Sequence, residues 1–215
     1  MPRERLATVG AQGLSDSELL AIFLGTGVAG KSATGLGETL LEHSGSLRGV
    51  LKPPPAALRR VRGIGPAKMS LLQAIGAAAQ RSLLEEMRSG PAALTPETVA
   101  DLMRLWIGGR TLEVFVCLYL DVQNRLLNRE ECSRGSLTHT AVYPRELARN
   151  ALDWNAAAVI IGHNHPSGDP EPSPANRSLT LELQKTLASI EVRLLDHLVV
   201  SQAAVVSFNE RGWLA

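Results

Sequence analysis

The chain contains little cysteine and no long apolar run. Only Cys117 and Cys132 are cysteines among 215 residues, and they stand 15 positions apart without C-x-x-C spacing. This excludes a zinc ribbon and a disulfide framework, and unpaired thiols are typical of the cytosol. No apolar stretch reaches the ~18 residues that a membrane span needs, and no signal-peptide core follows the N-terminus. We therefore expect a soluble cytoplasmic protein without a membrane partner.

Two common zinc-enzyme signatures are also missing. Nucleobase deaminases need H-x-E followed by P-C-x-x-C, and the chain has no cysteine pair to supply it. Gluzincin proteases need H-E-x-x-H on a helix, and the sequence does not contain it. The sequence also shows no internal repeat and no low-complexity tract, so repeat architectures are excluded.

Acidic residues are absent from one long segment of the front half. The formal net charge is only +1, but residues 1–90 carry 11 basic and 7 acidic residues, net +4, whereas residues 91–215 carry 11 and 14, net −3. No Asp or Glu occurs between His43 and Leu84. The basic residues of that segment are Arg48, Lys52, Arg59, Arg60, Arg62, Lys68 and Arg81. Such a segment suits a partner that carries phosphate groups.

Residues 1–88 have the pattern of a helical domain. Ser15-Asp16-Ser17-Glu18 has the spacing of a capping box, in which serine and glutamate side chains satisfy each other's free backbone amides. Prolines after Lys52 interrupt the helical pattern. We predict helices that begin at Ser15 and that span Ser32–His43, Ala56–Val61 and Ala67–Leu84.

The turn Gly63-Ile64-Gly65 between the last two predicted helices resembles a helix-hairpin-helix. In that motif the glycines let backbone amides approach a DNA phosphate, and the next helix adds its positive N-terminus. Flanking basic residues, including Arg62 and Lys68, would make such a contact non-specific for sequence and sensitive to salt. A helical packing or protein-docking module explains the same pattern equally well.

Gly25–Ser32 satisfies the P-loop pattern G-x-x-x-x-G-K-S, which cradles nucleotide phosphates. A P-loop must follow a strand, however, and the capping box at Ser15 predicts a helix there instead. Nucleotide binding is therefore a third hypothesis for this chain. Its competitor is a glycine-rich turn between two helices.

Residues 93–215 alternate between strand and helix patterns, and Ser89-Gly90-Pro91 is the predicted linker before them. The segments rich in β-branched and aromatic residues predict strands, and the amphipathic segments that begin with proline predict helices. The predicted strands are Val114–Asp121, Arg125–Cys132, Ala156–Gly162, Val192–Ser201 and Ala204–Phe208, and the predicted helices are Pro144–Trp154 and Pro174–Ile190. This half is predicted to be a mixed α/β domain.

Two histidines follow the predicted strand Ala156–Gly162 directly. His163 and His165 stand one residue apart in a loop rich in proline and glycine. Two imidazoles that leave a strand end in this way can turn toward one point, as two of the three protein ligands of a catalytic zinc do. The sequence therefore predicts a metal site in this loop.

The stretch from His163 to Asn176 closely resembles the metal-binding signature of the JAMM (MPN-type) metallopeptidases, in the form seen in the RadC family. That signature reads H-x-H-P-x6-S-x2-D, and this chain departs from it only at the last position, where Asn176 replaces aspartate. The resemblance covers nearly the whole chain. Further matching segments are Leu14–Ala21, Gly63–Lys68, Asp121–Arg125, Val142–Glu146, Asn155–Val159 and Leu195–His197.

Membership of that family implies a zinc-dependent hydrolase of peptide or isopeptide bonds, acting on a peptide or protein substrate. It implies a mixed sheet flanked by helices, with His163, His165 and position 176 as zinc ligands. It also implies that Glu113, just before the first strand, exchanges protons with the zinc-bound water and the leaving amine. Ser173 would stabilise the oxyanion. The name RadC implies a role in DNA repair.

Asn176 weakens the predicted zinc site. An aspartate would lower the net charge of the site from +2 to +1, whereas an asparagine amide is neutral and a poorer ligand. Asp169 or Asp196 could substitute as a ligand. Alternatively, Ser173 is simply a helix N-cap with Asn176 in the first turn, and the chain is a DNA-associated binding protein whose metal site has decayed.

Overall fold

A computed structural model describes residues 1–51, 61–89, 94–135, 142–201 and 204–214. The chain folds into two compact units, Met1–Ala79 and Gln80–Ala215. Helix α5 (Pro66–Ser89) runs through the point of division. The sequence-based division at residues 88 and 93 stays a prediction, and Gly90 and Pro91 of the expected linker lie outside the described residues.

The first unit is helical, as expected. The Ser15–Glu18 capping box is confirmed, because the Ser15 hydroxyl accepts the Glu18 amide proton and the Glu18 carboxylate accepts the Ser15 amide proton. Leucines from successive helices, among them Leu20, Leu36 and Leu72, form its core. Besides the start of α5, its elements are α1 (Pro2–Val9), the short 3₁₀ helix η1 (Ala11–Gly13), α2 (Asp16–Leu24), α3 (Ala33–Ser44) and α4 (Leu47–Leu51).

The glycine-rich segment that matches a P-loop is a turn between α2 and α3. A helix precedes it where a P-loop requires a strand, so the nucleotide-binding interpretation lacks its structural context. Ser32 caps α3 by accepting the Gly35 amide proton at 3.1 Å, and the Lys31 ammonium donates to the Thr39 hydroxyl. A Cβ on Gly27 would lie 2.1 Å from the Lys31 carbonyl oxygen, so tight packing of this turn explains that glycine.

The turn before α5 contains the two glycines of the predicted helix-hairpin-helix. Gly63 has a φ of +96°, and a Cβ there would lie 2.3 Å from a Val28 methyl group. Gly65 has open space at the Cβ position. The predicted helix Ala56–Val61, with Lys52, Arg59 and Arg60, lies almost entirely outside the described residues. The hairpin motif and its DNA contact therefore stay predictions.

The second unit is built on one mixed five-stranded sheet, which confirms the predicted mixed α/β fold. The strand order is β2-β1-β3-β4-β5; β3 and β4 are parallel, and the other neighbours are antiparallel. Besides the end of α5, its elements are α6 (Pro96–Ile107), β1 (Val114–Leu120), β2 (Leu126–Arg134), α7 (Pro144–Asp153), β3 (Ala158–Asn164), α8 (Pro174–Ala188), β4 (Arg193–Val200) and β5 (Val205–Ser207).

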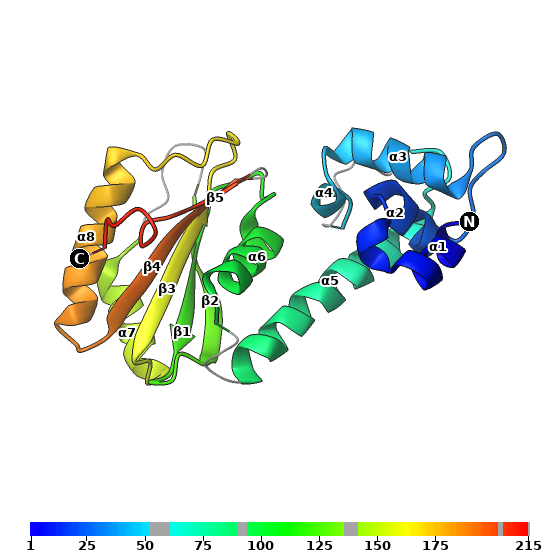
Figure 1. Ribbon diagram of the computed structural model, residues 1–215. Helices are drawn as coiled ribbons and strands as arrows, with labels where there is room; N and C mark the ends of the chain where they lie inside the picture. The colour runs from blue at the N-terminus through cyan, green and yellow to red at the C-terminus, as the bar shows by residue number, and fades with distance from the viewer. Residues whose placement is uncertain (52–60, 90–93, 136–141, 202–203, 215) are drawn as a thin grey trace. The chain divides into compact units, whose positions relative to one another are not determined.

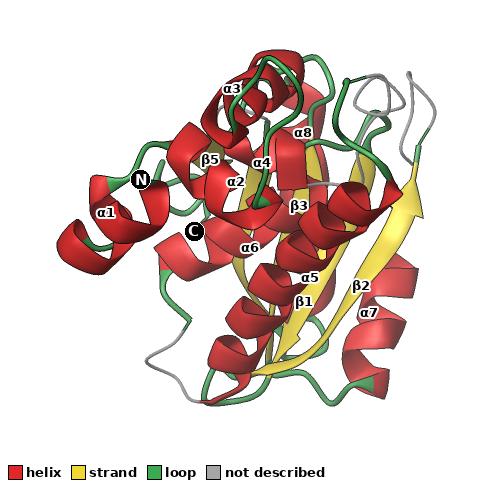
Figure 2. Ribbon diagram, turned by 90° about the vertical axis from the view of Figure 1, so that its right-hand side faces the viewer, coloured by secondary structure: helices red, strands yellow, loops and turns green. Residues whose placement is uncertain are grey.

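Alternating side chains of β1 divide the second unit into two apolar cores. Val116 and Leu118 point to one face of the sheet, where α6 and the end of α5 pack. Phe115 and Cys117 point to the other face, which α7 and α8 cover. Figures 1 and 2 show this three-layer arrangement within the second unit. Both faces of β1 and β3 are buried, so β1 and the first part of β3 are mostly apolar, and β3 ends in the buried polar residues His163 and Asn164.

Helix α6 was not among the predicted elements, although its start signals are in the sequence. Thr95 caps it by accepting the Thr98 amide proton, and Pro96 occupies the first helical position. Among the described helices of the chain, none is long and apolar enough to cross a membrane.

Candidate metal centre

His163 and His165 converge at the end of β3. His163 is 1 % exposed, and its Nε2 lies 3.0 Å from Nε2 of His165. The His165 amide still donates to the Val200 carbonyl of β4 at 2.9 Å, so sheet pairing fixes the backbone of both residues. The chain then turns at Gly168, whose φ is +93° and whose amide donates to the His165 carbonyl. The predicted convergence of the two rings is therefore present.

A chain of hydrogen bonds sets the tautomer of His163. The hydroxyl oxygen of Thr180 lies 2.6 Å from the carbonyl oxygen of Asn176, a separation that requires the Thr180 proton between them. Thr180 has no second proton, so Nδ1 of His197, 2.6 Å away, must donate to it. Nε2 of the neutral His197 ring then accepts from Nδ1 of His163 at 2.8 Å. Nε2 of His163 is consequently left with a lone pair.

Burial keeps both of these rings neutral. It lowers the pKa of His197 to about 3, and the nearby His165 adds to the shift. Burial also holds the pKa of His163 well below its ordinary value, with smaller contributions from His197 and His165. Neither ring is protonated at neutral pH.

His165 presents a second lone pair to the same point. Its Nδ1 lies 2.8 Å from the carbonyl oxygen of Asp169, which can only accept, so Nδ1 carries the proton and Nε2 of the neutral ring does not. Two lone pairs 3.0 Å apart repel each other unless a cation lies between them. Either a proton on His165 or a metal ion bound by both nitrogens meets this requirement, and imidazole pairs suit zinc.

Ser173 and Asn176 are bonded to each other in the first turn of α8. The Asn176 side-chain oxygen accepts from both the amide and the hydroxyl of Ser173, each at 2.8 Å. The Ser173 hydroxyl in turn accepts the Asn176 amide proton at 3.2 Å, which completes a capping box. The ordinary helix start that the sequence offered as an alternative is thus observed. A ligand role for Asn176 and an oxyanion role for Ser173 both require this box to open.

The two acidic substitutes suggested by the sequence do not join the histidines. Among the described residues, no group of three or more His, Cys, Asp or Glu side chains could hold a metal ion. The Asp169 carboxylate accepts the Glu171 amide proton at 3.0 Å. The Asp196 carboxylate accepts from the Ser207 hydroxyl and the Asn209 amide, and burial raises its pKa. In the structure both carboxylates therefore have other partners, and a ligand role for either aspartate stays a prediction.

Glu113 stands at the start of β1, beside the strand that ends in the two histidines. Phe115 pairs with His163 in the antiparallel ladder, and their rings stack with centroids 6.3 Å apart. Strand alternation places Glu113 on the same face as Phe115. The β1–β3 ladder ends at the Phe115–His163 pair, two residues after Glu113 and two before His165. The Glu113 carboxylate makes no hydrogen bond or ion pair with another residue in the described part of the chain.

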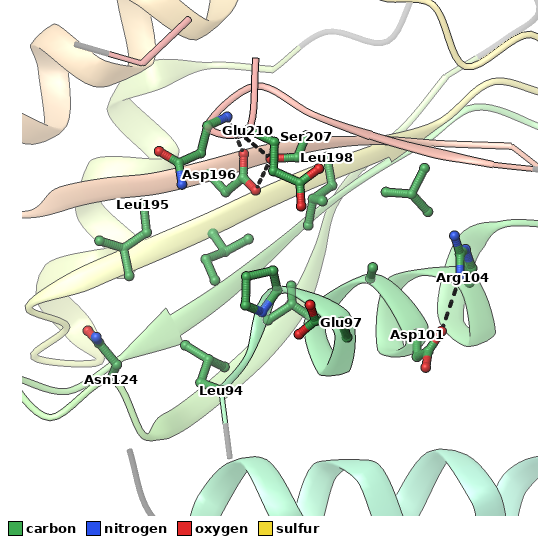
Figure 3. Close-up of a pocket in the computed structure, with 16 residues that line it drawn as sticks. Leu94, Glu97, Asp101, Arg104, Asn124, Leu195, Asp196, Leu198, Ser207 and Glu210 are labelled. Carbon is green, nitrogen blue, oxygen red and sulfur yellow. Dashed lines mark hydrogen bonds and ion pairs between the residues drawn. The ribbon is translucent and has the colours of Figure 1, made fainter. Parts of the chain in front are cut away.

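A cavity of about 480 Å³ lies at the other face of the sheet, between α6, β4 and the segment after β5. Figure 3 shows Asp196, Ser207 and Glu210 at one wall and Leu94 and Glu97 at the opposite wall. Neither histidine of the metal loop lines it. The cavity and the candidate metal centre are therefore separate features of this unit.

Sequence reasoning did not find the supporting residues of this centre. His197 entered only within the segment Leu195–His197 that resembles RadC proteins, and no role was assigned to Thr180 or Asn164. Asn164 was visible as the residue between the two histidines. Thr180 carried no signal, because its contact with His197 depends on how α8 packs over β4.

Comparison with known proteins identifies the family. A family model described as the RadC-like JAB domain matches residues 93–213, and one described as UPF0758 N-terminal matches residues 1–70. The chain belongs to the RadC-like JAB domain family. The predicted resemblance to RadC proteins is thereby confirmed.

Relatives in this family match along nearly the whole chain. UPF0758 proteins of Herminiimonas arsenicoxydans and Chromobacterium violaceum are each 51 % identical over 213 residues, covering 99 % of this chain and 95 % of the relative. One from Burkholderia mallei is 48 % identical over 214 residues, covering 100 % of this chain and 77 % of the relative. The names of these relatives specify a family and no reaction.

Proposed function

We propose that the chain is a zinc-dependent hydrolase of peptide or isopeptide bonds whose affinity for zinc is low. The observation that carries this proposal is the pair of Nε2 lone pairs of His163 and His165, which face each other across 3.0 Å. The JAB domain family, which is known for metallohydrolases, supports it. Bound zinc would supply a Lewis acid and a water of lowered pKa.

The residues of the chain have separate tasks in this reaction. His163 and His165 hold the metal, and the hydrogen bond from His163 to His197 fixes the orientation of one imidazole. Glu113 takes a proton from the attacking water and passes it to the leaving amine, which a carboxylate without internal partners can do. The Ser173 hydroxyl donates to the oxyanion once it is released from the Asn176 side chain.

Asn176 couples metal binding to stabilisation of the oxyanion by Ser173. Its side-chain oxygen accepts the Ser173 hydroxyl proton, so an Asn176 oxygen that turned to a metal would also free that hydroxyl. The same oxygen also accepts from the Ser173 amide, and leaving both bonds costs free energy. This competition, together with the neutral amide, is the physical reason to expect weak zinc binding.

Metal analysis of chain purified without chelator, beside Asn176→Asp, tests the proposal. We expect substoichiometric zinc in the native chain, a full equivalent in the variant, and cleavage of a fluorogenic peptide amide or a lysine ε-linked isopeptide by both when zinc is added. The proposed activity would be refuted if neither protein contained zinc, or if Asn176→Asp bound zinc but cleaved neither probe.

A second candidate function is a non-catalytic protein that binds DNA. The observation in its favour is the basic segment between His43 and Leu84, which contains no acidic residue. Gly65→Ala is the informative variant, because its Cβ enters open space, whereas Gly63→Ala would strike Val28. Retention on duplex DNA that falls with salt and with Gly65→Ala supports this function, and retention unchanged by Gly65→Ala contradicts it.

A further inference from the structure

Asn164, the residue between the two histidines, makes three hydrogen bonds to one segment of the chain. It is 1 % exposed. Its side-chain oxygen accepts the Val114 amide proton at 2.9 Å, and its side-chain nitrogen donates to the carbonyl oxygens of Arg110 at 3.2 Å and Leu112 at 3.1 Å. All three partners are backbone groups that flank Glu113, the proposed acid/base.

These bonds continue the β1–β3 pairing beyond the point where the ladder ends. Backbone pairing runs from Leu120↔Ala158 to Phe115↔His163 and stops there. The next pair would be Val114 with Asn164. The Asn164 side chain instead bonds to the backbone of residues 110–114, so it attaches the segment that leads into β1 to the end of β3.

We infer that Asn164 is the positioning residue that sets Glu113 relative to His163 and His165. The inference rests on the proposed hydrolase function. Strand alternation turns Asn164 to the face opposite the two imidazoles, so it does not compete for the metal. Because it lies between the two ligands in the chain, the metal ligands and the acid/base are held by one short stretch of backbone.

Only an amide suits this position. An aspartate could accept from the Val114 amide but would place a carboxylate against the two carbonyl oxygens that Asn164 now satisfies. An alanine would leave all three backbone groups without their partner. Asn164→Asp and Asn164→Ala therefore remove different parts of the same contact.

The test combines hydrogen exchange with a double-mutant cycle on the full, zinc-loaded chain. In Asn164→Asp we expect kcat for the peptide or isopeptide probe to fall about 100-fold, with KM changed less than about threefold, because the ground-state contacts remain. Binding of Co²⁺ and its visible spectrum should not change. In the Glu113→Gln background the same substitution should lower kcat no further, since Asn164 acts through Glu113. Equal losses in both backgrounds would overturn the inference.

Hydrogen exchange of the Val114 amide decides the positioning claim even if no probe is cleaved. We expect slow exchange in the native chain, and exchange at least about tenfold faster in Asn164→Ala, since local opening controls such rates. Asn128→Asp, on the neighbouring strand β2, is the matched control and should leave the amide protected. Rapid exchange in the native chain, or unchanged protection in Asn164→Ala, would overturn the inference. If the probe is not cleaved but the Val114 amide is protected as expected, the result counts against the proposed hydrolase function and not against the positioning role of Asn164.

Discussion

His163 on β3 donates its Nδ1 proton to Nε2 of His197 on the parallel strand β4, across 2.8 Å. His197 in turn donates to Thr180 of α8, so three elements that are distant in sequence fix the ring of His163. A ring held in this tautomer and orientation is preorganised to bind a metal through Nε2.

Replacement of His197 should therefore weaken metal binding without unfolding the domain. His197→Phe keeps a ring that can pack against Phe208, whose centroid is 4.7 Å away, but it removes the acceptor for His163. We expect zinc affinity to fall about 10- to 100-fold, as measured by competition with a chromophoric chelator. His43→Phe, on an exposed surface of α3, is the control. Equal affinities for native chain and His197→Phe would contradict the role.

Asn176→Asp should stabilise helix α8 and also strengthen zinc binding. Aspartate can accept the same two bonds from Ser173, and a negative charge in the first turn of a helix is favourable. We expect the metal-free variant to gain about 0.3–1 kcal/mol of unfolding free energy at pH 7, lost as the pH falls through the carboxyl pKa. Zinc affinity should rise at least about tenfold. A destabilised metal-free variant would show that the capping box does not tolerate the charge.

Acid should destabilise the metal-free second unit below about pH 6.5. The pKa of His197 is about 3 in the folded chain against an ordinary 6.5, so the unfolded state binds the extra proton and stability falls as the pH drops between these values. His197 alone should cost about 2 kcal/mol at pH 5. His163 shifts in the same direction. Urea unfolding with a chelator present, followed by tryptophan fluorescence, measures this unit, because Trp106, Trp154 and Trp213 all lie in it.

His197→Phe serves as the internal reference for that measurement. It removes one titrating group, so its stability should vary less between pH 7 and pH 5 than that of the native chain. The raised pKa of Asp196 acts in the opposite direction, since the folded state then takes up the proton more readily, and it is common to both proteins. Identical pH profiles would show that His197 is not held neutral by the fold.

In the turn between α2 and α3, the effect of a substitution on stability should depend on the room available for the new side chain, and not on any contact with a nucleotide. Gly27→Ala places a Cβ 2.1 Å from the Lys31 carbonyl oxygen and should cost about 1–3 kcal/mol. The control is Gly65→Ala in the separate turn before α5, which enters open space and should change stability by less than about 0.5 kcal/mol. Thermal unfolding followed by circular dichroism compares the two variants. Similar melting temperatures would mean that the turn is not packed as described.

Local patterns in the sequence predicted most of the fold. Capping residues and prolines located the starts of α2, α3, α7 and α8, because helix ends are set by side chains next to them. Apolar runs located β1 and β3, which are buried on both faces. Helix α6 was missed although Thr95 and Pro96 mark its start, since no adjoining prediction required a helix there.

The sequence by itself determined the family, the mixed α/β class and the pair of histidines, because these depend on residue type and spacing. The tertiary structure decided what those histidines can do. The strand register brings the start of β1, next to Glu113, beside the end of β3, where Asn164 bonds to the Val114 amide, and the packing of α8 brings Thr180 to His197. Hydrogen bonds between residues 17 and 34 positions apart leave no trace in a local pattern, yet they orient the Nε2 lone pair of His163 toward His165.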